Sequence, residues 1–341
     1  MHSWALVFSA FAVSSPTAAG VWHSLSSAQA PLTLIRGFAV PAAGASHFAI
    51  NTAVTTERQG NEKTETRHTE IPLCCDDGTF TIETYEPKGD GMAVIAVDNQ
   101  KGGVGKTTLT FNLAKGFAAR GMRILAIDND PQANLTRAFL AHPKELKANI
   151  LTIYETENSH IEPQQVGENL YLIGSDLHLA RVAERDFEVI YQLREGVESI
   201  KNHYDMVLID CLPSFGFLNM AALNAANYVF IPTTPSPFAL FGLKDLFDAI
   251  AKIQKRMNPE LRVLGIVLNL VEGRATTIAR ELEEALRETY GAVVFQSMIH
   301  KSVKLAESPA WHQSILEYEP KSKMATEFHR LMDEINERIK S

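Results

Sequence analysis

The stretch Lys101-Gly-Gly-Val-Gly-Lys-Thr-Thr108 decides the fold of this chain. It follows a short apolar run at 93–97 and precedes a helical pattern at 106–120. Glycines let the backbone curl and aim its N–H groups at phosphate oxygens, and a helix N-terminus adds partial positive charge. We therefore predict a phosphate-binding loop, in which Thr107 offers a hydroxyl to Mg²⁺. Its predicted nucleotide-binding residues are Gly102, Gly103, Val104, Gly105, Lys106, Thr107 and Thr108.

Apolar runs and helical patterns alternate from Met92 onward. Further strands are predicted at 123–127, 170–173, 206–209, 228–231, 261–270 and 293–295. Helical patterns lie between them, including 238–256 and 277–290, and a closing helix is predicted at 324–340. Continuous apolar strands joined by helices are typical of a mostly parallel, twisted sheet with helices on both faces. The fold class is therefore α/β, of the P-loop NTPase type.

Three carboxylates end or follow predicted strands, where ligands bind in such sheets. Asp128 and Asp130 follow the strand at 123–127, and Asp210 ends the strand at 206–209. A carboxylate at a strand end beside a phosphate loop can hold a metal-bound water. The alternative is a helix cap or a solvated turn. Asn269 also ends a strand, where it either contacts adenine or satisfies loop backbone.

Composition sets limits on the class of protein. The chain has 341 residues, is 45% hydrophobic and carries a formal net charge of −8. No apolar run reaches the roughly 18 residues of a membrane-spanning helix, and the acidic balance argues against a globally basic nucleic-acid binder. Three cysteines cannot make a disulfide framework or a four-cysteine zinc site, which favours a reducing, cytoplasmic setting.

Residues 1–91 differ in composition from the rest. They hold five Lys/Arg against nine Asp/Glu, with no charge before Arg36. An early apolar run resembles a secretory signal, but no Lys or Arg precedes it. We expect a poorly ordered leader or a misassigned upstream extension, followed by one domain over 92–341. The charge then divides into −4 for the leader (5 − 9) and −4 for the domain (27 − 31).

The phosphate loop departs from the common G-x-x-x-x-G-K-[ST] pattern in a specific way. Gln100 stands where glycine is usual, and Lys101 heads the loop. This is the deviant Walker A form, and here the sequence resembles the ParA/MinD superfamily, in particular Soj-like ParA ATPases. The resemblance continues through Asp128-Asn-Asp-Pro-Gln132, the strand ending in Asp210, and Lys304-Leu-Ala-Glu-Ser-Pro309.

The resemblance implies a role for each site residue. Lys106 would bind the β- and γ-phosphates of ATP, while Thr107, Asp128 and Asp210 would lie at the Mg²⁺. Asp130 matches the residue that orients or activates the attacking water. Lys101 resembles the signature lysine that reaches across a dimer to the partner's nucleotide, so catalysis would involve Lys101, Lys106 and Asp130.

The resemblance also implies an output, which the phosphate loop alone does not reveal. We expect an ATP-dependent homodimer that binds DNA nonspecifically on the nucleoid and hydrolyses ATP when a ParB-like partner, a centromere-binding or cargo-adaptor protein, stimulates it. Nonspecific binding needs Lys and Arg on one surface. By resemblance the candidates are Arg274, Lys301 and Lys304.

Other outputs have their own sequence requirements. An electron carrier of the nitrogenase-reductase type needs two cluster cysteines, but Cys74 and Cys75 lie in the leader. The main alternative is a MinD-like membrane-associated positioning ATPase, which needs a basic amphipathic terminal helix. The polar face of 324–340 mixes both signs of charge, so we expect this helix to pack on the sheet without stable membrane association. A scaffold with a relic phosphate loop is a third possibility.

Overall fold

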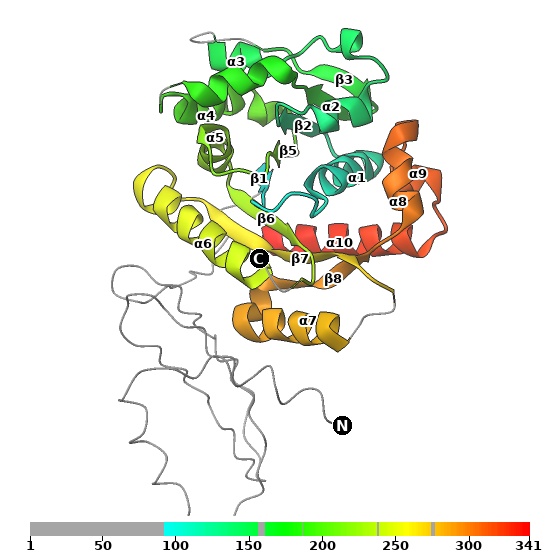
Figure 1. The fold of residues 1–341 in the computed structure, drawn as a ribbon. Coiled ribbons are helices and arrows are strands. Elements are labelled where there is room, and N and C mark those ends of the chain that lie inside the picture. Colours follow the sequence, from blue (N-terminus) through cyan, green and yellow to red (C-terminus); the bar gives the residue numbers. More distant parts are fainter. Residues whose placement is uncertain (1–91, 156–160, 186, 237–238, 274–276) are drawn as a thin grey trace, which may run out of the picture. The chain divides into compact units, whose positions relative to one another are not determined.

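The computed structural model describes residues 92–155, 161–185, 187–236, 239–273 and 277–341 (Figure 1). The predicted leader, 1–91, and Arg274 lie outside the described residues, so the leader's boundary stays a prediction. Among the described residues, no helix is long and apolar enough to cross a membrane.

Eight strands form one sheet in the order β3-β4-β2-β5-β1-β6-β7-β8. All neighbouring pairs are parallel except β3 and β4, which are antiparallel. β1 lies between β5 and β6, so the segment that follows it emerges at the middle of the sheet. The strands are β1 (Ala93–Val97), β2 (Ile124–Asn129), β3 (Gln164–Gly167), β4 (Leu170–Ile173), β5 (Met206–Cys211), β6 (Tyr228–Thr233), β7 (Arg262–Val271) and β8 (Val294–His300).

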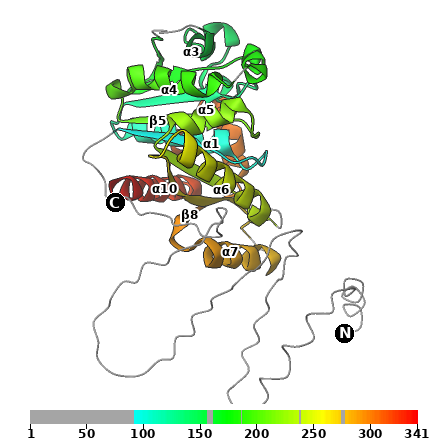
Figure 2. The ribbon, with the colours of Figure 1, turned by 90° about the vertical axis from the view of Figure 1, so that its left-hand side faces the viewer.

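Helices cover both faces of this sheet, as Figures 1 and 2 show from two sides. Alternate strand residues point to opposite faces, so Val94 and Ala96 join one hydrophobic cluster and Ala93 and Ile95 join the other. The first cluster includes residues of α3 (Leu151–Glu155), α4 (Val189–Ile200), α5 (Phe217–Ala225), α6 (Ala239–Arg256) and α7 (Thr277–Tyr290). The second includes residues of α1 (Lys106–Ala119), α2 (Asn134–Phe139), α8 (Val303–Glu307), α9 (Ile315–Tyr318) and α10 (Lys323–Lys340).

The predicted α/β class is confirmed, and the departures from it are local. The edge strand β3 was not predicted because its Gln164-Gln-Val-Gly167 sequence is polar and short. The predicted last strand was too short: β8 continues through Gln296-Ser-Met, which is exposed or half-buried. α5 was also not predicted, since its apolar Phe217–Ala225 sequence has no polar face that would reveal a helical period.

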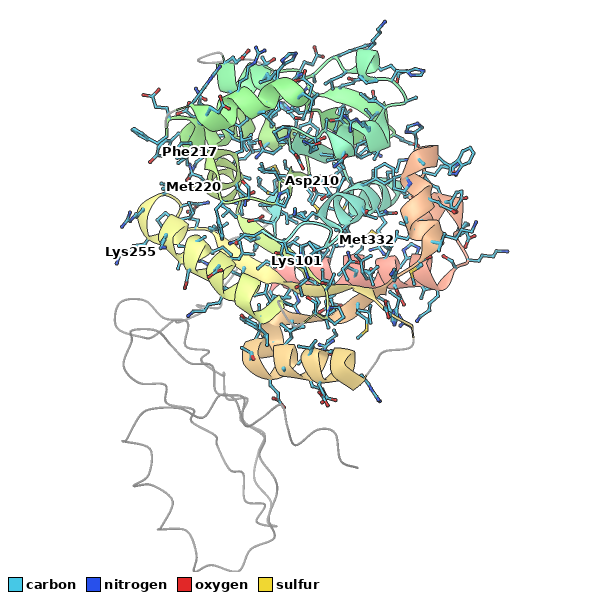
Figure 3. The ribbon with its side chains drawn as sticks, in the orientation of Figure 1. Lys101, Asp210, Phe217, Met220, Lys255 and Met332 are labelled. Carbon is cyan, nitrogen blue, oxygen red and sulfur yellow. The ribbon has the colours of Figure 1, made fainter. Side chains whose placement is uncertain are left out.

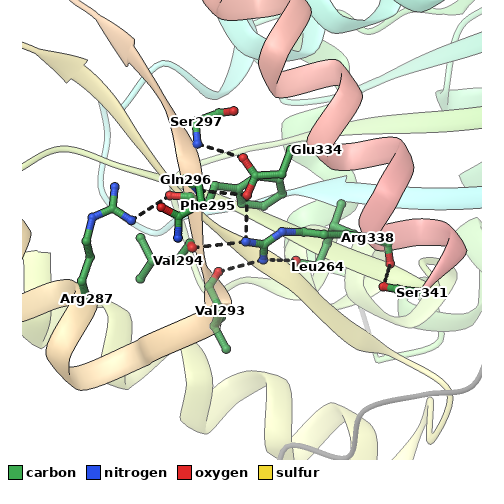
Figure 4. A network of polar contacts seen from close by, with 10 residues as sticks. All are labelled: Leu264, Arg287, Val293, Val294, Phe295, Gln296, Ser297, Glu334, Arg338 and Ser341. Carbon is green, nitrogen blue, oxygen red and sulfur yellow. Dashed lines mark hydrogen bonds and ion pairs between the residues drawn. The ribbon is translucent and has the colours of Figure 1, made fainter. Parts of the chain in front are cut away.

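The closing helix α10 packs on the sheet, as predicted. Its apolar stripe is buried: Met324, Phe328, Leu331, Met332 and Ile335 are each at most 7% exposed. Charged groups hold its C-terminal part against β8 (Figure 4). Glu334 accepts hydrogen bonds from the N–H groups of Gln296 and Ser297, both at 2.8 Å, and the Arg338 guanidinium lies 3.9 Å from the Phe295 ring centroid.

Candidate nucleotide-binding site

The phosphate loop connects β1 to α1 and brings its lysine back toward the sheet. Gly103 and Gly105 have φ of +75° and +86°, a backbone conformation that favours glycine. Lys106 begins α1 and is 7% exposed. Its Nζ donates to the carbonyl of Asn99 at 2.7 Å and lies 3.4 Å from that of Lys101. The ammonium is therefore folded onto the start of its own loop.

Asn269, at the carboxyl-terminal part of β7, holds this loop from the side. Its Nδ2 donates to the carbonyl of Val104 at 2.7 Å, while its buried Oδ1 has no partner among the described residues. A Cβ added to Gly105 would collide with that same Nδ2. Of the two roles considered for Asn269, support of the loop backbone is what the structure displays, and contact with adenine stays a prediction.

Lys101 is exposed at the head of the loop and contacts the segment after β6. Its Nζ donates to the Ser236 hydroxyl at 2.8 Å and lies 3.4 Å from that of Thr234. Figure 3 labels Lys101 and Asp210, which come from the loop after β1 and from β5, two neighbouring strands of the sheet. The reach of Lys101 to a partner's nucleotide stays a prediction.

Asp128 and Asp210 face each other in register at the carboxyl ends of β2 and β5. Both are fully buried. Burial and the neighbouring Asp128 charge raise the pKa of Asp210 well above its usual range, against Thr107 and Lys106, which lower it. Burial likewise raises the pKa of Asp128 to about 6, although hydrogen bonds from Thr136 lower it. Two desolvated carboxylates beside one lysine make a site that favours bound cations.

The two carboxylates differ in how their oxygens are used. Asp128 Oδ2 accepts from the Thr136 amide at 2.8 Å and hydroxyl at 2.7 Å, and Oδ1 accepts from the Asp130 amide at 3.2 Å. Asp210 Oδ2 is buried and has no partner among the described residues. Asp128 therefore fastens α2 to the end of β2, and Asp210 keeps an oxygen for a ligand.

Asp130 lies in the turn that follows β2 and is 8% exposed. Its Oδ1 accepts from the Gln132 amide at 2.8 Å, which fixes the carboxylate within the turn. Asp130 therefore lies at the carboxyl-terminal ends of the strands, as Asp210 and the phosphate loop do.

The residues present fit a Mg²⁺ ion held together with phosphate. Asp210 provides an unpartnered oxygen, and the Thr107 hydroxyl interacts with the same carboxylate. No group of three or more His, Cys, Asp or Glu that could hold a metal occurs in the described part of the chain. Mg²⁺ does not require one, because it usually keeps several waters and takes one or two carboxylates plus phosphate oxygens.

Asp98 and Asn219 form a buried hydrogen-bonded pair beside the loop that the sequence did not predict. Asp98, the residue after β1, is fully buried, and both of its oxygens accept from Nδ2 of Asn219 on α5, at 3.0 and 2.9 Å. Asp98 could have been singled out from the sequence, because it directly follows an apolar strand and precedes the glycines of the loop. Nothing local marks Asn219, which the fold brings in from 121 positions away.

The predicted DNA-contacting lysines lie at the end of β8 and on α8, and each has an acidic neighbour. Lys301 Nζ lies 3.8 Å from Glu272, and Lys304 Nζ lies 3.4 Å from Glu307. Both lysine side chains are about half exposed or more, at 67% and 49%. Exposed pairs of this kind are weak, so the lysines are free to exchange partners, but the glutamates reduce the net charge of this surface.

Sequence families match most of the described region. The family described as "AAA domain" matches residues 92–263. A family of "4Fe-4S iron sulfur cluster binding proteins, NifH/frxC family" matches residues 188–341. Within that second range the sequence has one cysteine, Cys211, which is buried. That match therefore reflects the fold and does not supply the cysteine pair that such a cluster needs.

Solved structures share the fold. The chain is similar to cobyrinic acid a,c-diamide synthase from Mycobacterium smegmatis with a bound ATP analogue and magnesium, with 27% identity, a TM-score of 0.62, and 71% and 93% of the two chains covered. It is also similar to MinD from Pyrococcus horikoshii complexed with Mg-ADP, with 24% identity, a TM-score of 0.60, and 72% and 96% covered. At that lower identity the likeness concerns the fold alone.

Curated relatives identify the family. The chain is 34% identical over 255 residues to the chromosome-partitioning ATPase Soj of Thermus thermophilus, covering 72% of this chain and 96% of that protein. It is 31% identical over 255 residues to the sporulation initiation inhibitor protein Soj of Bacillus subtilis, with 71% and 97% covered. The chromosome partitioning protein ParA of Caulobacter vibrioides is 31% identical, with 72% and 94% covered. The chain belongs to the Soj/ParA family of P-loop ATPases.

Proposed function

We propose that this protein is a partitioning ATPase that binds Mg²⁺·ATP, dimerises on it, binds DNA nonspecifically and hydrolyses ATP when a ParB-like partner stimulates it. One observation carries the proposal. The buried Lys106, the Thr107 hydroxyl and the unpartnered oxygen of Asp210 lie together at the carboxyl ends of the central strands, beside the turn that holds Asp130. We propose that the protein acts on the nucleoid in the cytoplasm, because its proposed ligand is DNA.

Each residue has a distinct task in the proposed cycle. Lys106 would leave the Asn99 carbonyl and bind the β- and γ-phosphates, while Thr107 and Asp210 would hold Mg²⁺ and its waters. Magnesium supplies charge neutralisation on the phosphates. Asp130 orients the attacking water, and its fixed place in the turn suits that task. Asp128 supports this site by holding α2, a role that its bonds to Thr136 favour over direct metal ligation.

Lys101 acts late in this cycle. In the monomer its ammonium is bound to Ser236 of the same chain. A role in the partner's active site therefore requires Lys101 to leave that hydroxyl when two subunits meet. An ammonium brought in at that moment would stabilise transition-state charge as an arginine finger does.

The membrane-positioning alternative is less well supported. It would need the apolar face of α10 on a lipid surface, but that face is buried against the sheet and α1. Releasing it would expose Phe328, Leu331 and Met332 from the core, at a cost of several kcal/mol. We therefore propose no stable membrane association.

Retention of the full chain on DNA tests the proposal, measured with ATP, ADP and no nucleotide at several salt concentrations. ATP-dependent retention that falls steeply with salt is expected. In the Lys301→Ala/Lys304→Ala variant, losing two phosphate contacts lowers the slope of log K against log salt by about 1.8. A matched control is Lys252→Ala/Lys255→Ala, at the end of α6 and over the other face of the sheet. Retention without ATP, or an equal effect of the control, would contradict the proposal.

A further inference from the structure

A cavity of about 390 Å³ lies beside α2, and the proposed ATPase cycle does not use it. Its walls come from α2, from the segment that follows α2, and from residues 175–178 at the start of the 3₁₀ helix η3 (Leu177–Glu184). Among the described residues that line it, none belongs to the phosphate loop at 101–108. Clefts of roughly 300–1,000 Å³ are large enough to enclose a small molecule.

Three polar side chains of this cavity have no partner among the described residues. Ser175 is 2% exposed, so it lies at the inner end of the cavity, and its hydroxyl makes no hydrogen bond. The guanidinium of Arg137 and the ring of His178 are exposed, and neither forms a hydrogen bond or an ion pair with a described residue. A buried polar group without a partner is unfavourable, so the Ser175 hydroxyl indicates a place for a ligand group.

The other polar groups of the cavity are already engaged within the protein. Asp176 Oδ1 accepts from the His178 amide at 2.7 Å, and its Oδ2 accepts from Nδ2 of Asn149, also at 2.7 Å. The Thr136 hydroxyl likewise both donates and accepts within the chain. The groups that stay available are a guanidinium, a hydroxyl and an imidazole, all of which can donate hydrogen bonds. They suit a ligand that is rich in acceptor oxygens.

Apolar side chains complete the lining of the cavity. Leu140, Pro143 and Leu146 contribute to its walls. Leu177 lines it as well and is 64% exposed, which is unusual for a large apolar side chain. A bare phosphate ion would leave this apolar surface in water, whereas an organic group would cover it. The lining therefore favours a ligand with an apolar body and an anionic head.

We infer that this cavity is a second ligand site, and that it binds a small organic phosphate monoester through Arg137, His178 and Ser175. A guanidinium can hold two phosphate oxygens at once, and the hydroxyl adds a donor at the inner end. The apolar part of the ligand packs against the leucines of the lining. This inference goes beyond the proposed ATPase function and does not depend on it.

The cavity lies close to the carboxylates of the candidate metal site. The Ser175 amide donates to Thr136 Oγ1 at 2.8 Å, and the Thr136 hydroxyl donates to Asp128 Oδ2 at 2.7 Å. Gly174 permits this close approach, because a Cβ added there would collide with Thr136 and Leu146. A ligand bound to Ser175 would therefore lie two hydrogen bonds from Asp128 without touching the phosphate loop.

Titration of the full chain with phenyl phosphate, followed by ligand-observed NMR, tests the inference. We expect binding, and we expect it to be about tenfold weaker for phenol, which lacks the phosphate, and for inorganic phosphate, which lacks the ring. An excess of Mg²⁺·ADP should leave the binding of phenyl phosphate unchanged. Absence of binding, or equal binding of phenol or inorganic phosphate, would overturn the inference. Displacement by ADP would do so too, because the phosphate loop would then be the site.

Arg137→Ala, compared with Arg181→Ala, tests the position of the site. Arg137→Ala should bind phenyl phosphate about tenfold more weakly, because it loses charge-assisted hydrogen bonds to the phosphate. Arg181 is also exposed and lies on η3, but it does not line the cavity. Arg181→Ala therefore removes the same charge nearby and should leave the affinity nearly unchanged. Equal weakening in both variants would indicate general electrostatic attraction and would refute the site.

Ser175→Ala tests the inner end of the cavity. Because the Ser175 hydroxyl has no partner among the described residues, its removal should not lower the melting temperature. Phenyl phosphate should bind about threefold more weakly, and unchanged affinity would contradict the contact with Ser175. If the original chain binds phenyl phosphate but no ATP, the proposed function alone fails; if it binds ATP but no phenyl phosphate, this inference alone fails.

Discussion

Replacing Gly105 with alanine tests how tightly Asn269 supports the phosphate loop. Gly105 has φ of +86°, which costs an L-residue about 1–2 kcal/mol. The added Cβ also collides with Asn269 Nδ2, which now donates to the Val104 carbonyl at 2.7 Å. Losing that hydrogen bond and leaving a buried amide unpaired costs about 1–3 kcal/mol. Together the free energy of unfolding should fall by about 3 kcal/mol.

Gly103 provides the comparison. Its φ of +75° imposes a similar strain, but nothing lies within 4 Å of a Cβ added there. Gly103→Ala should therefore cost about 1–2 kcal/mol, from the backbone alone. Urea unfolding of both variants measures the difference.

A double-mutant cycle isolates the contact with Asn269. In an Asn269→Ala background the space beside Gly105 opens, so Gly105→Ala should then cost no more than Gly103→Ala. Equal losses for Gly103→Ala and Gly105→Ala in the original chain would refute the reasoning. It would mean that Asn269 moves aside freely and does not constrain the loop.

Three further predictions concern charge. Lys106→Ala should abolish ATP binding, measured by titration, because the only other lysine of the loop, Lys101, is exposed and bound to Ser236; normal turnover would argue against the phosphate site. Asp130→Ala should bind ATP but hydrolyse it at least tenfold more slowly and accumulate as a dimer in sizing experiments; a monomer with unchanged turnover would rule this role out. Folding raises the pKa of Asp98 from 3.8 to about 6, so this group favours folding below about pH 4 and loses that contribution as the pH rises through 6. At 1.36 kcal/mol per unit, Asp98→Asn should gain up to about 3 kcal/mol over the original chain between pH 4 and 7 in denaturant unfolding. If the difference in the free energy of unfolding between the two proteins does not change with pH, the raised pKa of Asp98 is contradicted.

The sequence predicted the residues whose role depends on local spacing. The glycine pattern placed Lys106 and Thr107 at a helix start, and strand ends placed Asp128 and Asp210, which the sheet pairs in register. Residues far apart in sequence were harder to judge. The metal role predicted for Asp128 did not foresee Thr136, whose amide and hydroxyl both bind that carboxylate.

The same reason explains what was missed around the loop. Asn219 contacts Asp98 because β5 pairs with β1 in the sheet and α5 packs on the face that these strands share. The nine-residue sequence of α5 contains no pattern that predicts this polar contact. The lysines predicted to contact DNA were considered as single charges, whereas the fold places Glu272 beside Lys301. Pairings of this kind depend on strand order, which single-sequence patterns do not encode.

The place of α10 has a consequence for how the protein is made. Its Met332 fills the space beside Gly116 of α1, where even a methyl group would collide with the methionine sulfur. α1 is synthesised early and α10 last among the described elements. The part of the sheet face that α10 covers therefore stays exposed until the ribosome has produced both helices. At about 5–20 residues per second that interval is on the order of ten seconds or more. During the first part of that time β1 also lacks its neighbours β5 and β6. We therefore expect the emerging polypeptide to be a client of nascent-chain chaperones.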